Sequence, residues 1–154
     1  MNKIMIAVDD TKGTAEMFEK IVKICKCMSP DEIILLYVEK FEGRSLMDEM
    51  LGDAEMSTLR EELEGTEIKD ALDRKAEKIL SYYKNIMESS PPVPIVKPIV
   101  RTGHPAEEII NGAQEEGAEL IIIGTSGKRV RKFLIGSVSR EVANNASVPV
   151  LLVR

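Results

Sequence analysis

The chain has 154 residues, of which 44% are hydrophobic and 31% charged, and its formal net charge at pH 7 is −5. This length is typical of one folded domain, which we expect to span 1–154, and the negative charge argues against nucleic-acid binding. No apolar run approaches the roughly 18 residues of a membrane span, and the N-terminal sequence MNKIMIAVDD is not typical of a signal peptide or lipidation site. We therefore expect a cytoplasmic protein that has no membrane partner.

Five short apolar runs are expected to form strands. Most are continuous rather than alternating, which is typical of strands buried on both faces of a parallel sheet. In chain order they are KIMIAV (3–8), EIILLYV (32–38), VPIVKPIV (93–100), ELIIIG (119–124) and VPVLLV (148–153).

A helical pattern lies in each interval between these runs, with apolar residues three and four positions apart. The four sets are Phe18, Ile21, Val22 and Cys25; Leu72, Ala76, Ile79, Leu80, Tyr83 and Met87; Ala106, Ile109, Ile110 and Ala113; and Val138, Val142 and Ala146. Pro105 suits the first turn of the third helix, and Gly117 is expected to end it. The alternation predicts an α/β fold with a parallel sheet covered on both faces.

The connection at about 39–69 is long for a compact domain, and such connections are usually functional or disordered. One short amphipathic helix is predicted within it by Leu46, Met47, Met50 and Leu51. Two interpretations stand: a helix packed on the domain surface, or a lid or partner-contact segment, since methionine adapts to variable surfaces.

The stretch GTSGKRVRKFLIGS, from Gly124 to Ser137, separates the fourth strand from the last helix. Open parallel sheets bind ligands beyond the carboxyl ends of their strands, and the helix that comes after Gly136 begins with free amides. Glycines let the backbone approach a phosphate, while Lys128 and Arg129 could neutralise its charge. The stretch favours a polyphosphate site, although glycines that only form turns would also fit it.

Two other phosphate loops are absent. There is no G-x-x-x-x-G-K-[ST], and the first strand is followed by VDDTKGTAE rather than G-x-G-x-x-G. The chain instead resembles the universal stress protein family over almost its whole length. The segments AVDD, IILLYV, RTGHPAEEII, GAELIIIGTSG and SVPVLLV occur in the order typical of that family.

The nucleotide-binding branch of the family is marked by G-x2-G-x9-G-[ST], which corresponds here to Gly124, Gly127, Gly136 and Ser137. The resemblance implies an open, doubly wound, Rossmann-like sheet of five parallel strands in the order 3-2-1-4-5. It also implies that the protein binds ATP (or AMP or ADP), with Mg²⁺ or Mn²⁺ beside a triphosphate. A homodimer formed through the last strand is implied as well.

The same resemblance implies which residues meet the nucleotide. Ala7 and Asp9 would approach the ribose and adenine, and Val38 would meet the base through its backbone. The full set of expected binding residues is Ala7, Asp9, Val38, Gly124, Thr125, Ser126, Gly127, Lys128, Arg129, Val130, Gly136, Ser137, Val138 and Ser139.

The chain departs from the family pattern at two places. Ala7 stands where the branch often has proline, and only eight residues, KRVRKFLI, separate Gly127 from Gly136 where the motif has nine. Reach is not limiting, because nine peptide steps span about 30 Å when extended. However, the loss of one residue from a helical part would rotate the later residues by about 100°. Phosphate contacts near Lys128 and near Ser137 therefore need not both form.

No catalytic residue is expected. His104, the only histidine, precedes Pro105 and suits a capping or surface role, and Asp9 is the carboxylate we nominate to hold a metal ion. Because no acid–base pair stands beside the glycine loop, we expect slow ATP hydrolysis at most. We therefore hypothesise that the protein binds ATP and regulates the stress response together with an unidentified protein partner. The alternative is a dimeric interaction protein of the same fold that does not bind ATP.

Overall fold

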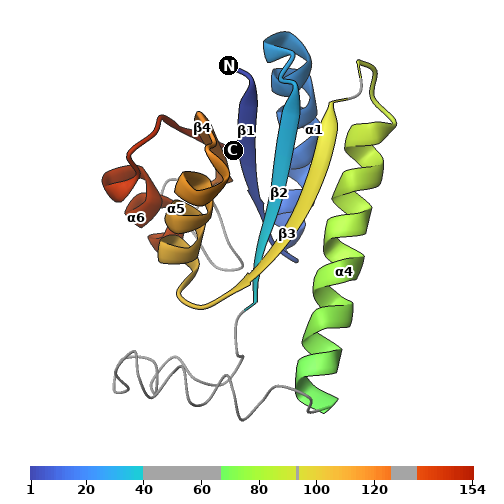
Figure 1. Cartoon of the computed structure of the whole chain (residues 1–154), viewed down its shortest axis with the longest axis vertical. Coiled ribbons are helices and arrows are strands. Elements are labelled where there is room, and N and C mark those ends of the chain that lie inside the picture. Colours follow the sequence, from blue (N-terminus) through green and yellow to red (C-terminus); the bar gives the residue numbers. More distant parts are fainter. Residues whose placement is uncertain (40–66, 93, 126–134) are drawn as a thin grey trace.

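The computed structural model describes residues 1–39, 67–92, 94–125 and 135–154. Along these ranges strands and helices alternate (Figure 1). In chain order the elements are β1 (Lys3–Val8), α1 (Lys12–Met28), β2 (Glu32–Glu39), α4 (Glu67–Glu88), β3 (Ile95–Thr102), α5 (Pro105–Glu116), β4 (Leu120–Gly124), α6 (Ser137–Asn145) and β5 (Val150–Val153). The short helix predicted from Leu46 to Leu51 lies outside the described residues.

The five strands form one parallel sheet in the order β3-β2-β1-β4-β5, which confirms the predicted topology. Each of the four intervals between strands holds a helix, as predicted. The third strand was predicted at 93–100 but runs from Ile95 to Thr102. Its limits match those of its partner, because it pairs with β2 along its whole length, from Glu32↔Ile95 to Glu39↔Thr102.

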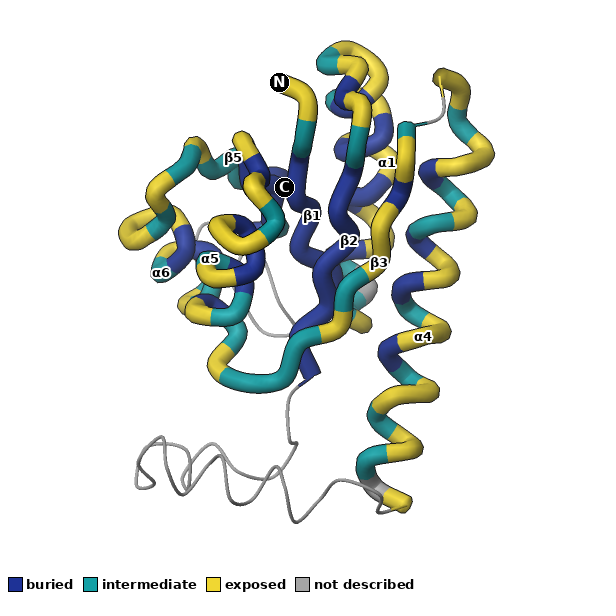
Figure 2. The backbone as a smooth tube through the Cα atoms, viewed as in Figure 1, coloured by how far each residue is buried: buried dark blue, intermediate teal, exposed yellow. Residues whose placement is uncertain are grey.

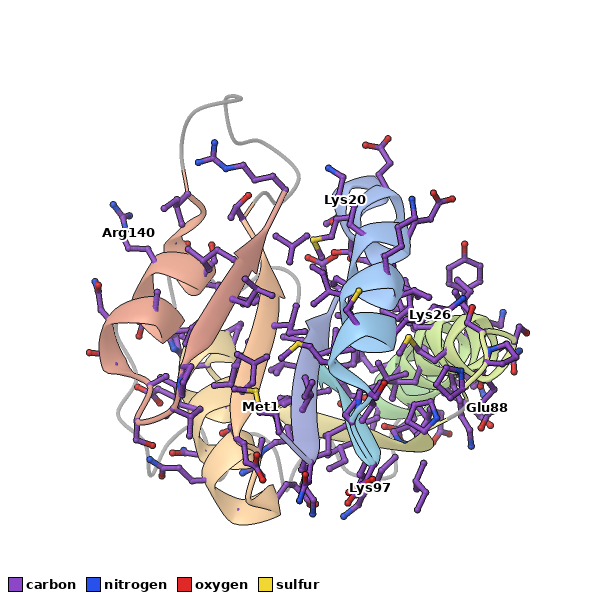
Figure 3. The ribbon with its side chains drawn as sticks, turned by 90° about the horizontal axis from the view of Figure 1, so that it is seen from above. Met1, Lys20, Lys26, Glu88, Lys97 and Arg140 are labelled. Atoms are coloured by element: carbon purple, nitrogen blue, oxygen red, sulfur yellow. The ribbon has the colours of Figure 1, made fainter. Side chains whose placement is uncertain are left out.

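Helices cover both faces of the sheet (Figure 3). On one face α1 and α4 bury a core in which the ring centroids of Phe18 and Tyr83 lie 4.4 Å apart. On the other face α5 and α6 pack over alternate residues of the same strands. The central strands β1, β2 and β4 are therefore buried almost throughout, as their continuous apolar runs predicted. Figure 2 shows this burial for β1 and β2.

The edge strand β3 is half exposed and contains Pro98, which an edge tolerates because one side of the strand needs no ladder partner. The ends of α5 also match the sequence. Pro105 occupies its first turn, and Gly117 caps its end with a φ of 66°. None of the helices within the described ranges is long and apolar enough to cross a membrane.

Candidate functional site

The order of strands reverses between β1 and β4, so a crevice is expected beyond their carboxyl ends. Ala7 of β1 pairs with Ile123 of β4, and therefore Asp9 and Gly124 lie at the same edge of the sheet. The predicted nucleotide-binding residues of β1, β2, β4 and the start of α6 lie at this edge. Ser126, Gly127, Lys128, Arg129 and Val130 lie outside the described residues.

Two backbone hydrogen bonds fix the ends of the glycine loop. The amide of Thr125 donates to the carbonyl of Val153 (3.0 Å), and the amide of Gly136 donates to the carbonyl of Thr125 (2.8 Å). Thr125 itself is 4% exposed. The chain therefore leaves the sheet after β4 and returns to the same point before α6 begins.

The first turn of α6 offers backbone donors at this point for which the described residues provide no partner. Gly136 is the N-cap, with φ −60° and ψ 156°, and no side chain caps the helix. The first helical bond runs from the amide of Arg140 to the carbonyl of Gly136 (3.0 Å), so earlier amides lack a partner within the helix. The exposed Ser137 adds a hydroxyl beside them. Such a helix end attracts anions.

The side chains of two predicted contact residues of α6 take part in the local structure of the protein, one through a hydrogen bond and one through packing. Ser139 is 3% exposed, and its hydroxyl donates to the carbonyl of Gly136 (3.1 Å). Val138 packs partly against the core under α5 and α6. Any ligand contact from these two residues would therefore come through their backbone.

Asp9 is held rigidly by the first turn of α1. Its Oδ1 accepts hydrogen bonds from the amide of Thr11 (2.9 Å), the hydroxyl of Thr11 (2.6 Å) and the hydroxyl of Thr14. Thr11 also caps α1, because its hydroxyl accepts from the amide of Thr14 (3.3 Å). With three donors on Oδ1, only Oδ2 of Asp9 remains to meet a metal ion or a ribose hydroxyl.

Gly124 has a packing role that the sequence did not reveal. A Cβ at this position would lie 2.6 Å from Sδ of Met17, so glycine leaves room for the end of the Met17 side chain where α1 packs against β4. At Gly136 a Cβ would lie 3.4 Å from the carbonyl oxygen of Thr125, which is close but tolerable. Packing against Met17 is therefore one reason for glycine at this position that involves no ligand.

A buried carboxylate at the end of β2 was also missed. The side chain of Glu39 is fully buried, and its Oε2 accepts from Nζ of Lys69 (2.9 Å) and the hydroxyl of Thr102 (3.1 Å). Its Oε1 has no hydrogen-bond partner among the described residues. Burial alone would lower the pKa of Lys69, but hydrogen bonds to Asp73 and Glu39 outweigh it and raise that pKa. This cluster joins the ends of β2 and β3 to the start of α4.

The remaining candidates have no special chemistry. His104 is the N-cap residue of α5 without a side-chain capping bond, and its Nδ1 lies 3.8 Å from Oε1 of Glu141. This placement confirms a surface position and excludes a capping bond from its ring. In the part of the chain that the structure describes, no group of three or more histidine, cysteine or acidic side chains could hold a metal ion.

Comparisons with known proteins agree with the fold and the sequence pattern. The chain matches the model of the universal stress protein family over residues 1–154. It is 34% identical over 158 residues to universal stress protein MJ0577 of Methanocaldococcus jannaschii, an alignment that covers 100% of this chain and 96% of that protein. A solved structure of MJ0577 has a TM-score of 0.74 at 27% identity, covering 99% of this chain and 94% of that one.

Two more distant solved structures share the fold and hold nucleotides. The universal stress protein of Archaeoglobus fulgidus in complex with dAMP has a TM-score of 0.63 at 19% identity and covers 100% of this chain and 98% of its own. An Arabidopsis thaliana protein of the family with AMP bound has a TM-score of 0.65 at 16% identity, covering 99% and 90%.

Proposed function

Because the chain belongs to the universal stress protein family, we propose that it binds an adenine nucleotide, ATP foremost, at the carboxyl edge of β1 and β4. The observation that carries the proposal is the uncapped first turn of α6, placed where Gly136 returns to Thr125. Amides without helical partners at that point suit phosphate oxygens. The dAMP and AMP in the two distant relatives support the choice of an adenine nucleotide.

The residues at this edge divide between the parts of the ligand. The hydroxyl of Ser137 and the first amides of α6 would hold phosphates, while Asp9 and the backbone of Val38 would lie toward the ribose and base. Oδ2 of Asp9 is the atom we assign to Mg²⁺ or Mn²⁺, because Oδ1 already accepts three hydrogen bonds. A bound metal ion would neutralise part of the triphosphate charge.

We assign the protein a regulatory task rather than rapid catalysis. A hydrolase needs a group that positions or deprotonates water. Among the described carboxylates at this edge, Asp9 is held by α1 through Oδ1, Asp10 pairs with Lys75 (2.8 Å), and Glu39 is buried against Lys69. We therefore expect turnover far below the roughly 1–100 s⁻¹ that is typical of kinases.

Titration calorimetry with ATP tests the site. Gly127→Val should weaken binding most, because a side chain there would collide with phosphate or strain the backbone by about 1–3 kcal/mol. Lys128→Ala should weaken it least, because dissolved salt screens the attraction of a single side-chain charge for phosphate, and Ser137→Ala should fall between. Ser81→Ala, on the exposed surface of α4, is the matched control and should change nothing. Unchanged affinity in both Gly127→Val and Ser137→Ala would place the nucleotide elsewhere.

The eight-residue interval favours a second candidate, a dimeric interaction protein of the same fold that does not bind ATP. Insertion of one residue between Val130 and Ile135 separates the two. If the insertion tightens ATP binding markedly, the natural loop holds phosphate poorly and the second candidate gains. If the insertion weakens binding, the short loop is a working variant.

We also infer that two chains pair antiparallel through β5. This strand pairs with β4 on one side, and Val150, Leu151 and Leu152 are only partly buried. An exposed apolar edge strand invites pairing with another strand. Light scattering at micromolar concentration should give the mass of a dimer, and a monomer mass alone would exclude this arrangement.

A further inference from the structure

A groove between the start of α1 and α4 adjoins the candidate nucleotide site, because Asp9 and Thr11 line one end of it, but its α4 wall has residues that the nucleotide site does not use. It consists of two cavities, of about 330 and 420 Å³, which are neighbours because both are lined by Asp10, Lys78 and Ile79. The two helices whose residues line it, α1 and α4, lie on the face of the sheet opposite α5 and α6 (Figure 3).

The α4 wall of the groove is cationic and aromatic. Arg74, Lys75, Lys78 and Tyr82 line it, on one side of the helix. Lys75 is paired with Asp10 (2.8 Å). Arg74 and Lys78 are exposed, and no described residue forms an ion pair with either.

The groove also has an apolar floor and one exposed aromatic ring. Ala15 of α1 and Ile79 of α4 form part of the floor. Tyr82 is 56% exposed, and its ring is held edge-on against that of Tyr83, with 5.1 Å between the ring centroids. An exposed tyrosine beside exposed cations is typical of an interaction hot spot, where tyrosine and arginine are enriched.

We propose that this groove docks an acidic amphipathic helix from a partner protein. The wall from Ala71 to Tyr82 is about 16 Å long, which matches three turns of a bound helix. Apolar side chains on one face of such a helix would cover Ile79 and Tyr82, while carboxylates at its margin would pair with Arg74 and Lys78. This is the helix-in-groove mode of recognition.

Charge selects this occupant over others. The protein carries a net charge of −5, so Arg74 and Lys78, exposed and without an ion-pair partner among the described residues, are a local exception that attracts acidic groups. A nucleic acid or an anionic membrane needs a broader basic face, whereas here Asp10 stands on the opposite wall. An acidic helix meets the cations on one side only. The proposal does not require a bound nucleotide, although Asp9 lines both this groove and the candidate nucleotide site.

A displayed library of helical peptides, selected against the full chain, tests the proposal. Enriched peptides should combine acidic residues with aliphatic or aromatic anchors, and their affinity should fall as salt rises. Lys78→Glu should weaken their binding at least about fivefold, because it turns an attraction into a repulsion. Tyr82→Ser should weaken binding to a similar extent. Lys23→Glu, an exposed change of equal charge on α1 outside the groove, should leave the affinity within about twofold.

Several results would overturn the proposal. These are a failure to enrich any peptide, an enrichment of basic or neutral peptides, and unchanged binding of the enriched peptides to Lys78→Glu and Tyr82→Ser. Vesicles that contain phosphatidylglycerol provide the remaining arm. If they bind the wild-type chain and Lys78→Glu abolishes that binding while no peptide is enriched, the surface serves membranes instead. Circular dichroism of each variant confirms that a lost affinity does not come from lost folding.

Discussion

Gly124 provides a quantitative test of how α1 packs against the candidate site. In Gly124→Ala the new methyl group would lie 2.6 Å from Sδ and 2.7 Å from Cε of Met17, closer than real Cβ atoms approach. Met17 is 5% exposed and belongs to the core under α1, so its side chain must move within a packed environment. The clash involves the flexible end of a methionine, and Gly124 does not have a positive φ. We therefore expect a loss near the lower end of the roughly 1–3 kcal/mol typical of overpacking.

A double-mutant cycle separates this clash from other effects. Met17→Ala alone should cost about 2–5 kcal/mol, because it leaves a cavity in the core. In the double variant the methyl group of Ala at position 124 occupies part of that cavity and meets no sulfur. The double variant should therefore lose less stability than the sum of the two single losses, with a coupling of about 1–2 kcal/mol.

Urea unfolding measured by circular dichroism gives each free energy of unfolding. Met87→Ala is the control partner for Gly124→Ala, because Met87 is 3% exposed in the same core but lies beside Ile95, at the opposite end of the sheet. That pair should be additive within about 0.5 kcal/mol. If the Met17 pair is equally additive, the glycine does not provide the space that α1 occupies, and the packing explanation for Gly124 is wrong.

Three further outcomes are expected from the described side chains. Burial raises the pKa of Cys25 to about 11. At pH 8 the Cys25 thiol should therefore react with a disulfide reagent far more slowly than the thiol of the exposed Cys27, and equal rates would contradict this. Burial, together with nearby acidic groups, raises the pKa of Tyr83 to about 12. The neutral Tyr83 side chain therefore stabilises the folded state fully below about pH 10, and this stabilisation is lost as the pH rises toward 12. Tyr83→Phe should reduce this alkaline loss in unfolding experiments, and an identical pH profile would refute the assignment. Lys69→Ala should lower the free energy of unfolding by about 2–3 kcal/mol, because it leaves the buried Glu39 carboxylate without its cation. Adding Glu39→Ala to that variant should recover part of the loss. If the two losses simply add, the pair is not coupled.

The fold was predictable because its determinants are local in sequence. Continuous apolar runs mark strands that are buried on both faces, and periodic apolar sets such as Phe18, Ile21 and Cys25 mark the covering helices. The strand order came from the resemblance to the family rather than from these patterns. The limits of β3 were two residues off because they depend on its pairing with β2, which no local pattern records.

The chemistry of the site was less predictable because it depends on contacts between distant residues. The sequence placed Asp9 at the correct edge, but not the three hydrogen bonds that occupy its Oδ1. Glu39 begins a polar stretch and gives no sign of burial, since Lys69 and Thr102 meet it only in the folded chain. Gly124 fitted a phosphate motif, and its contact with Met17 became evident only from the packing of α1.

Nucleotide retention at equilibrium tests the central proposal most directly. The protein is dialysed against equal low concentrations of ATP, ADP, AMP and GTP, then denatured, and the released nucleotides are separated by chromatography. We predict that an adenine nucleotide, ATP foremost, is recovered above the level in the dialysis buffer and approaches one per chain as its concentration rises. Recovery of no nucleotide above the buffer level would contradict adenine nucleotide binding by this chain.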